Sequence, residues 1–333
     1  MAANTRERRI GIIILKALCA VFIVLAALLI GANAYILNAY HAFYAQSERA
    51  FAIPGIQEGF IPQDIDHVAE YDCWLFSGYA CGNEPSPVYL LRSDGTTARL
   101  AVLDEVGEPY FDHGSAITSN DQHLYLTCEG GYLVFDLNAL NNIKDGDVLT
   151  AQGRCKLDFS PAFMNIENDL LYTGNFYHPE SYETDEMFHV TTPNGSTNRS
   201  VIYVFEEDPA TVSGFAEMPT NAYSIPDRIQ GCAFDGKMLY LSQSYGLATS
   251  HVLAFDMSTL TSVDIFQTAQ GPVDMTVLEE GEAAQDLALP PMSEGIEIHD
   301  GKLFISFESA SNKYLFGKLY GAGAVYALPL SER

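Results

Sequence analysis

The chain contains one phrase that decides its fold, Gln230-Gly231-Cys232-Ala233-Phe234-Asp235-Gly236-Lys237-Met238-Leu239-Tyr240-Leu241. The phrase returns at residues 294–305 with the same length and the same Asp-Gly-Lys turn. Weaker copies occur at residues 63–76, 113–126 and 163–172. A repeat of roughly fifty residues made of short strands and tight turns is typical of a β-propeller, in which each repeat forms one blade.

Within the phrase, an Asp-Gly pair separates two apolar runs, which predicts a hairpin because Gly accepts the positive φ of a tight turn. We expect an inner strand at residues 229–234, a second strand at 238–243 and a third at 250–256. Equivalent third strands are expected at residues 88–91, 132–136, 201–205 and 324–328. The predicted fold class is all-β, a β-propeller with five or six blades.

Two alternatives to this assignment remain open. An antiparallel sandwich could use the same hairpins, although recurrence of the whole phrase favours the propeller. The segment 271–291 is rich in Glu, Ala and Pro without clear alternation, so it is either a long loop or a degraded sixth blade.

The N-terminal segment indicates where the propeller is located. Residues 17–37 contain no charge and are long enough to span a bilayer as a helix, and the preceding residues are basic. We expect a cytoplasmic basic segment at 1–16, a single-pass transmembrane anchor at 17–37, a stalk at 38–58 and an extracytoplasmic propeller at 59–333. A signal peptide cleaved near Ala34 is the alternative, which would give a secreted protein.

The charge of the chain restricts its partners. The formal net charge is −26, and the first sixteen residues carry net +3, which leaves −29 for the remainder. Such a surface repels nucleic acid and anionic lipid headgroups, so we expect no nucleic-acid partner.

If the propeller lies outside the cytoplasm, its cysteines are in a compartment where disulfides can form. Cys73 with Cys81, and Cys128 with Cys155, are candidate pairs, although spacing alone does not establish connectivity. Cys232 lies in a predicted inner strand and is the expected unpaired thiol.

Inner strands line the channel of a propeller, so residues at matching repeat positions should form a ring at its mouth. Aligning the repeats places Gln63, His113, Ala162, Gln230 and Glu294 in one position, with Asp64 just beyond it. Four of these five aligned residues are polar, which makes them candidates for binding a metal or a polar ligand. The competing interpretation is that they bond only to neighbouring backbone and trapped water.

Two further sets of residues are candidates for ligand binding. Polar and aromatic residues gather where the second strands end, which suits carbohydrate or peptide binding: Ser77, Tyr79, Glu129, Asn175, Tyr177, Gln243, Ser244, Tyr245, Glu308 and Ser309. Residues 176–200 form an insertion too long for a hairpin turn and rich in acidic residues and His. Long loops on rigid scaffolds often carry binding, but a solvated acidic loop is the simpler interpretation.

The phrases at residues 61–63, 113–114, 230–246 and 293–309 resemble those of secreted or membrane-anchored bacterial propeller proteins without assigned activity. More distantly, the spacing of the repeats resembles that in the six-bladed superfamily of calcium-dependent lactonases and gluconolactonases. That second resemblance implies calcium held by Glu, Asn and Asp at the channel mouth. Glu294 matches the Glu, whereas the other aligned positions hold Gln, His and Ala.

No nucleophile elbow, P-loop, dinucleotide fingerprint or His-Glu-x-x-His motif is present in the sequence, so no catalytic or cofactor-binding residue is assigned. Our first hypothesis is a membrane-tethered extracytoplasmic propeller that binds a small ligand, a glycan or a protein partner. The alternative is a calcium-dependent hydrolase of a lactone or ester, acting at the central channel. A structural component of the cell envelope is a third interpretation.

Overall fold

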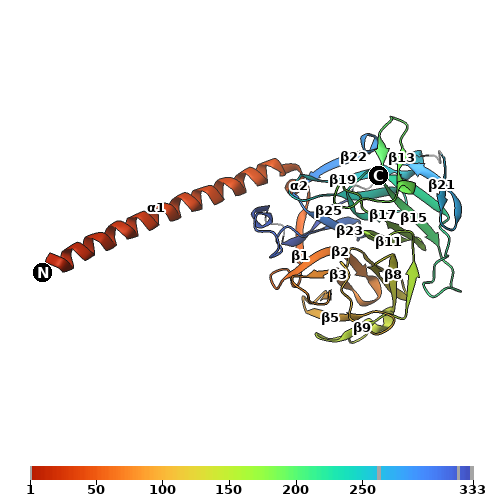
Figure 1. Cartoon of the computed structure of the whole chain (residues 1–333), viewed down its shortest axis with the longest axis horizontal. Helices are drawn as coiled ribbons and strands as arrows, with labels where there is room; N and C mark the ends of the chain where they lie inside the picture. Colours follow the sequence, from red (N-terminus) through yellow and green to blue (C-terminus); the bar gives the residue numbers. More distant parts are fainter. Residues whose placement is uncertain (1, 261–263, 321–322, 331–333) are drawn as a thin grey trace.

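The structure is a computed structural model that describes residues 2–260, 264–320 and 323–330, with side chains described from residue 9 onward. A long helix, α1 (Ala2–Ala39), is followed by the short helix α2 (His41–Gln46). Figure 1 shows α1 projecting away from a body of radially arranged strands. The described strands form five blades, so the predicted all-β propeller preceded by an apolar helix is confirmed.

Each blade is mainly an antiparallel meander that begins with its inner strand. The first two blades consist of β2 (Phe60–Val68), β3 (Cys73–Ala80), β4 (Val88–Arg92) and β5 (Thr97–Leu103), and of β6 (Ile117–Ser119), β7 (His123–Cys128), β8 (Gly131–Asp136) and β10 (Gly153–Lys156). The next two consist of β11 (Phe163–Glu167), β12 (Leu170–Gly174), β15 (Ser200–Glu206) and β16 (Asn221–Ile225), and of β17 (Ile229–Phe234), β18 (Met238–Gln243), β19 (Ser250–Asp256) and β22 (Gln285–Leu289). The fifth contains β23 (Ser293–His299), β24 (Lys302–Phe307), β25 (Ala324–Pro329) and β1 (Glu48–Ala52).

The remaining elements decorate the blades. Strand β9 (Val148–Thr150) pairs parallel to β5, and β13 (Val190–Thr191) pairs with β14 (Thr197–Asn198) inside the insertion. Single 3-10 turns are η1 (Ala69–Tyr71), η2 (Leu137–Leu140), η3 (Glu186–Phe188), η4 (Met257–Thr259), η5 (Glu280–Glu282) and η6 (Gly317–Tyr320).

The segment 271–291 does not form a sixth blade. Strand β21 (Gly271–Val277) pairs parallel to β16 and antiparallel to β20 (Asp264–Thr268), so both strands widen the third blade. Strand β22 is the outer strand of the fourth blade. The segment that we expected to be a loop or a degraded blade therefore completes two neighbouring blades.

The chain closes the ring with a strand from its N-terminal side. The inner strands β2, β6, β11, β17 and β23 lie beside one another in this order, and β23 lies beside β2. Strand β1 pairs antiparallel with β25, so the fifth blade joins segments from opposite ends of the chain. The Phe43 side chain of α2 is fully buried in the same blade. Much of the expected stalk at 38–58 therefore belongs to the propeller, and this boundary is corrected.

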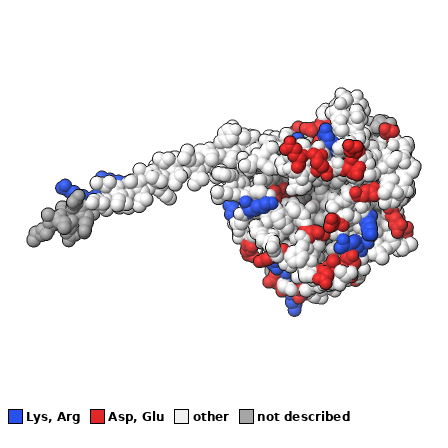
Figure 2. Space-filling model, in the orientation of Figure 1, with Lys and Arg blue, Asp and Glu red and all other residues white. Residues whose placement is uncertain are grey.

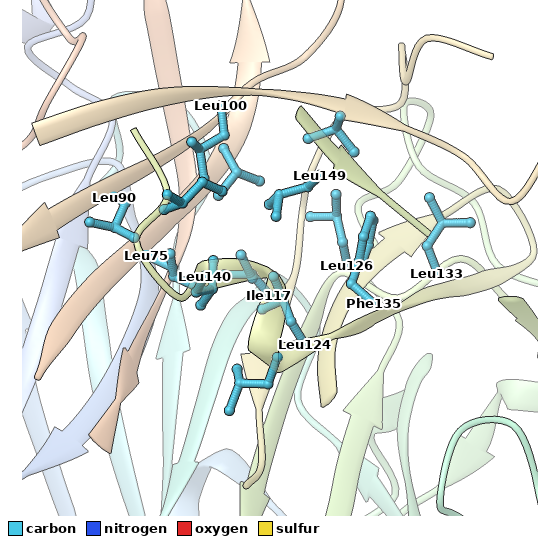
Figure 3. Packing of buried hydrophobic residues seen from close by; sticks show 14 of the residues in the cluster. Leu75, Leu90, Leu100, Ile117, Leu124, Leu126, Leu133, Phe135, Leu140 and Leu149 are labelled. Atoms are coloured by element: carbon cyan, nitrogen blue, oxygen red, sulfur yellow. The ribbon is translucent and has the colours of Figure 1, made fainter. Parts of the chain in front are cut away.

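Apolar clusters fill the spaces between adjacent blades. Figure 3 shows the cluster between the first and second blades, which joins Leu75 and Leu90 of the first blade with Leu126 and Phe135 of the second. Four further clusters lie at the other four blade interfaces. Burying apolar surface at every interface is the main force that holds the ring closed.

Glycine in the repeated phrase allows the inner strands to approach closely. A Cβ atom on Gly295 would lie 1.8 Å from Asp64 Oδ1 and 2.6 Å from the Cα atom of Asp64. A Cβ atom on Gly231 would lie 2.9 Å from the carbonyl oxygen of Glu294. Only Gly permits these contacts, which explains why Gly follows the polar residue in both strong copies of the phrase.

Helix α1 is apolar along the span Arg9–Ala39, which is long enough to cross a membrane, and none of its most apolar window is buried against the propeller. Side chains such as Phe22 and Ile30 are exposed on its surface. Continuous apolar exposure of this kind is unfavourable in water. The helix is therefore compatible with a membrane anchor or with a signal sequence.

Candidate functional site at the mouth of the channel

A cavity of about 950 Å³ opens where the inner strands begin. All five blades contribute to it. Its lining includes every residue that the repeat alignment placed in one position: Gln63, His113, Ala162, Gln230 and Glu294. The structure therefore brings together four of the five predicted site residues, together with the aligned Ala162, whereas Asp64 lies outside the lining.

A repeated backbone irregularity directs three of these side chains. Gln63, Gln230 and Glu294 each lie where the pairing of an inner strand with its second strand shifts register. A β-bulge of this kind bends the strand and re-aims the side chain at the bulge. The same local geometry thus recurs in the first, fourth and fifth blades and supplies polar groups to the cavity.

Two carboxyl groups meet at the cavity floor. Glu294 and Glu308 are only 2% and 9% exposed, and the carboxyl of Glu294 donates a hydrogen bond to that of Glu308. Gln63 Nε2 donates to Glu308 Oε2 at 3.1 Å, and the Tyr314 hydroxyl supplies a further hydrogen bond. Burial, and then the neighbouring Glu308, raise the pKa of Glu294 well above its ordinary value. Burial also raises the pKa of Glu308, although hydrogen bonds from Tyr314, Gln63 and Glu294 and the ammonium of Lys313 oppose that rise, so Glu294 is the member of the pair that holds its proton more strongly.

Aromatic rings and one ammonium group form the adjoining wall. The Nζ atom of Lys313 lies 4.9 Å from the ring centroid of Tyr79 and 5.2 Å from that of Tyr314. The His113 ring lies 4.2 Å from the Tyr79 ring, centroid to centroid. The His113 side chain is exposed, yet the protein packed around its ring and the ammonium of Lys313 lower its pKa to about 4. It is therefore neutral at pH 7.

The insertion at residues 176–200 forms another wall of the cavity. Tyr182, Glu183 and Asp185 line the cavity from this segment. The His178 ring stacks on the Tyr245 ring at 3.6 Å between centroids, which joins the insertion to the fourth blade. Part of the insertion that we interpreted as a solvated acidic loop therefore belongs to the site.

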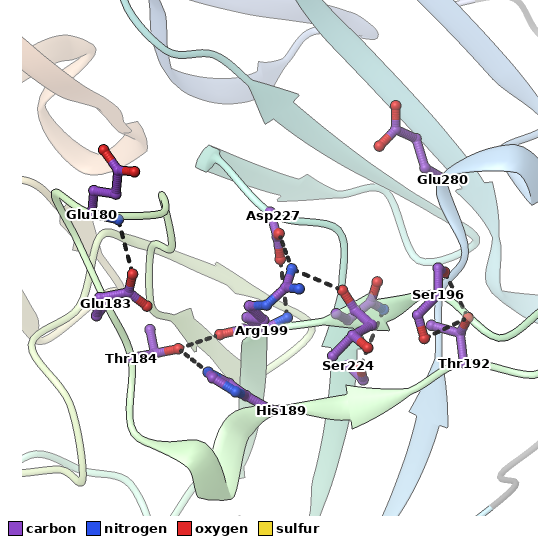
Figure 4. Close-up of polar contacts among 12 residues, drawn as sticks. Glu180, Glu183, Thr184, His189, Thr192, Ser196, Arg199, Ser224, Asp227 and Glu280 are labelled. Carbon is purple, nitrogen blue, oxygen red and sulfur yellow. Dashed lines mark hydrogen bonds and ion pairs between the residues drawn. The ribbon is translucent and has the colours of Figure 1, made fainter.

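Polar contacts hold the insertion against the scaffold (Figure 4). Thr184 Oγ1 donates to the carbonyl oxygen of Arg199 at 2.7 Å, and it lies 3.2 Å from His189 Nε2. The Arg199 guanidinium forms an ion pair with Asp227 at 2.8 Å. These contacts position the wall before any ligand is present, which lowers the ordering cost of binding.

Asp64 has a different position from the one that we expected. Its Oδ1 atom accepts from the backbone N–H of Ile65, and its Oδ2 atom accepts from that of Ile117, both at 2.9 Å. The second contact joins the inner strands of the first two blades. Burial raises the pKa of Asp64 well above its ordinary value. Both carboxyl oxygens are thus committed to holding the ring together.

Only some of the polar and aromatic residues at the ends of the second strands line the cavity. Tyr79, Glu129, Asn175, Tyr245 and Glu308 line the cavity. The other members of this set lie outside its lining: Ser77, Tyr177, Gln243, Ser244 and Ser309.

The proposed disulfides are not present, because all the described cysteines are free thiols. Strand β3 begins at Cys73 and ends just before Cys81, so roughly 26 Å of extended chain separates them. Cys128 and Cys155 lie on β7 and β10 with β8 between them, which is roughly 10 Å. A disulfide needs Cα atoms within about 7 Å. Cys232 is a buried thiol, as we expected.

The geometry does not provide an evident calcium site. Among the residues that the structure describes, no group of three or more His, Cys, Asp or Glu side chains is arranged to hold a metal ion. The Glu294 carboxyl is engaged with Glu308, and both Asp64 oxygens accept backbone N–H groups. The present arrangement therefore does not fit the calcium ligand set that the lactonase resemblance implies.

Sequence reasoning missed Lys313 and Tyr314, which line the cavity from the loop after β24. Neither has a counterpart in the other repeats, so aligning the repeats could not find them. Tyr182 lies in the insertion, which the sequence singled out only as a whole.

No protein-family model matches this chain, and no curated protein matches it. Solved structures similar to it include a PQQ-bound aldose sugar dehydrogenase from Streptomyces coelicolor, at 11% identity and a TM-score of 0.47, covering 84% of this chain and 96% of the other. A gluconolactonase from Xanthomonas campestris is 14% identical with a TM-score of 0.38, covering 86% and 95%. A glutaminyl cyclase from Myxococcus xanthus is 12% identical with a TM-score of 0.42, covering 85% and 94%. These are distant likenesses among propellers and assign no chemistry to this chain.

Proposed function

We propose that this chain is a membrane-tethered propeller that binds a small polar ligand in the cavity at the channel mouth. The observation that carries the proposal is the cavity itself, because about 950 Å³ of space is bounded by convergent polar groups and aromatic rings. Small-molecule sites are usually concave, largely pre-formed and fitted with a few placed polar groups. A free glycan end or a side chain of a protein partner would meet the same requirements.

The charge of the lining restricts the ligand. Seven carboxyl side chains and a single Lys line the cavity. Figure 2 shows Asp and Glu spread across the visible face of the propeller, with few Lys and Arg among them. This field disfavours anions, including nucleic acid, and favours neutral polyhydroxylated or cationic ligands. The exposed apolar helix supports a membrane tether, with the propeller outside the cytoplasm.

A cavity-filling substitution tests this proposal. The purified chain in detergent is screened by thermal melting and calorimetry against saccharides, amines and amino acids. Ala162→Trp places an indole in the cavity and should abolish any binding, whereas Ala288→Trp, on the exposed outer strand β22, should not. Binding that survives Ala162→Trp unchanged would place the ligand elsewhere and contradict the proposal.

The Glu294–Glu308 pair supports hydrolysis as a second candidate function. A protonated carboxyl beside a carboxylate is an arrangement that can supply a general acid and a general base. Glu294→Gln keeps a hydrogen-bond donor but removes the transferable proton, so it should abolish turnover of any lactone or ester that the chain hydrolyses. Unchanged turnover in this variant would exclude the pair.

Calcium dependence remains a separate proposal within this second candidate. Calorimetry with calcium, and melting with and without chelator, tests it directly.

A further inference from the structure

The wall of the cavity already holds an ammonium group. Lys313 lies in the loop between β24 and β25, and its Nζ atom lies 4.9 and 5.2 Å from the ring centroids of Tyr79 and Tyr314. The same atom donates a hydrogen bond to the hydroxyl of Tyr79. A cation within about 6 Å of a ring centroid is attracted by the negative face of the ring. Two rings from different blades thus form a subsite that fits an ammonium group.

Negative charge lies behind these rings. Burial opposes the charged form of Lys313, but the hydrogen bond to Tyr79 and the nearby carboxylate of Glu308 raise its pKa overall. Glu308 is itself fixed by Gln63, so its charge stays in place when the lysine moves. The neutral state of His113 adds no repulsion. The subsite is therefore built for a cation and not only for this lysine.

The lysine can leave without unfolding the propeller. Lys313 is exposed, and it is carried by a loop in which Leu315 and Phe316 are 77% and 65% exposed. The cavity continues past it toward Tyr182, Tyr245 and Glu183. A ligand that filled this space would bring its own cation to the same rings.

We infer that the cavity binds ligands that carry an alkylammonium group, and that Lys313 is a built-in occupant that such a ligand displaces from the rings of Tyr79 and Tyr314. This inference rests on the proposed ligand binding and names the chemical class of the ligand. It also predicts that Lys313 competes with the ligand for the subsite and so lowers the affinity of the native chain for that ligand. An occupant that fills a site nine-tenths of the time lowers the apparent affinity about tenfold.

The test compares two lysines of the same loop. Lys313→Met keeps the chain length and removes the ammonium, whereas Lys318→Met removes an ammonium that bonds Asn312 and does not line the cavity. Calorimetry on the full chain in detergent uses butylammonium and tetramethylammonium, with butanol and neopentyl alcohol as neutral analogues of similar shape. Lys313→Met should bind the cations about tenfold more tightly than the native chain, and Lys318→Met should match the native chain.

A double variant locates the binding. Adding Tyr314→Leu to Lys313→Met should reduce the affinity for both cations, because one ring face is lost. The inference is overturned if Lys313→Met binds neither cation, or if the neutral analogues bind as tightly as the cations. Melting temperatures of every variant confirm that each is folded.

The same samples separate this inference from the proposed function. Binding of a neutral saccharide that Ala162→Trp abolishes, without any ammonium binding, would overturn the inference and leave the proposed function standing. Absence of binding to every saccharide, amine and amino acid by folded protein would overturn both.

Discussion

The carboxyl group of Glu294 donates a hydrogen bond to that of Glu308, so two acids of the fifth blade share one proton at the floor of the cavity. Glu294 comes from the bulge in β23, and Glu308 follows the last residue of β24. Two buried carboxylates side by side would repel each other, and retaining one proton removes that repulsion. The pair therefore joins the first two strands of the blade through a hydrogen bond rather than through opposite charges.

Replacement of Glu294 tests the contribution of this hydrogen bond to stability. Glu294→Ala leaves the buried carboxylate of Glu308 without this donor, so the free energy of unfolding should fall by about 1–3 kcal/mol. Glu294→Gln retains a donor and should lie within about 1 kcal/mol of the native chain. Urea unfolding at pH 7, followed by the fluorescence of the buried Trp74, measures both. Equal losses in the two variants would contradict the proton-sharing arrangement.

Because the folded state raises the pKa of Asp66, we expect the free energy of unfolding to fall as the pH rises. Burial raises its pKa to about 7, although Ser119 Oγ donates to its Oδ2 atom at 2.6 Å. Below pH about 4, the carboxyl is protonated in both the folded and the unfolded state. As the pH rises toward 7, only the unfolded state ionises, so stability is lost progressively and levels off above the folded pKa. The loss should be on the order of a few kcal/mol.

Asp66→Asn should flatten that part of the pH profile. The amide oxygen still accepts from Ser119, but no proton is gained or lost. Unfolding free energies between pH 4 and pH 8 are compared with those of Glu70→Gln, which alters an exposed carboxyl. A profile for Asp66→Asn as steep as that of Glu70→Gln would show that Asp66 is not the titrating group.

Gly295→Ala should strongly destabilise the propeller. The new Cβ atom would lie 1.8 Å from Asp64 Oδ1, and Asp64 cannot move away without breaking its bonds to two backbone N–H groups. Overpacking of this kind costs about 1–3 kcal/mol or more. Gly281→Ala, where no atom lies within 4 Å, is the matched control and should be close to neutral. Similar melting temperatures for the two variants would contradict the close approach of the inner strands.

The described cysteines should react as separate thiols. Burial raises the pKa values of Cys73 and Cys128 to about 12, which keeps both protonated and unreactive. Cys81 is exposed and should be the first propeller thiol labelled by a maleimide in native protein. Mass spectrometry after native and denatured labelling measures this order. A mass deficit of two protons in unreduced protein would reveal a disulfide and contradict the structure.

The N-terminal strand should be required for ring closure. A chain that begins at residue 59 lacks both β1 and Phe43, so β25 and the apolar cluster of the fifth blade are uncovered. We expect that chain to unfold without a cooperative transition, whereas a chain beginning at residue 41 should melt sharply. Calorimetric melting of the two chains distinguishes them. Cooperative melting of the shorter chain would restore the interpretation of 38–58 as a stalk.

Much of the fold could be predicted from the sequence because its determinants are local. Strands β17, β18 and β19 span the residues that alternation and the Asp-Gly turn predicted. The five aligned residues of the repeats meet around one cavity, because equal repeats rotate equal positions toward one axis. The blade count needed the structure, since β21 and β22 pair with strands far away in sequence.

The chemistry of the site depended on contacts that no repeat encodes. Lys313 reaches the ring of Tyr79 across more than two hundred residues of sequence, and the insertion reaches Tyr245 of the next blade. The proton on Glu294 results from burial beside Glu308, which is a property of the closed ring and not of either residue alone.

The sequence by itself determined the repeating strands, the turns, the apolar N-terminal helix and the ring of polar positions, because these depend on short-range periodicity and on residue type. Only the tertiary structure decided which cysteines are too far apart to pair, which acid keeps a proton and which lysine enters the cavity. Distances, burial and electrostatic fields between residues distant in sequence exist only once the five blades have closed.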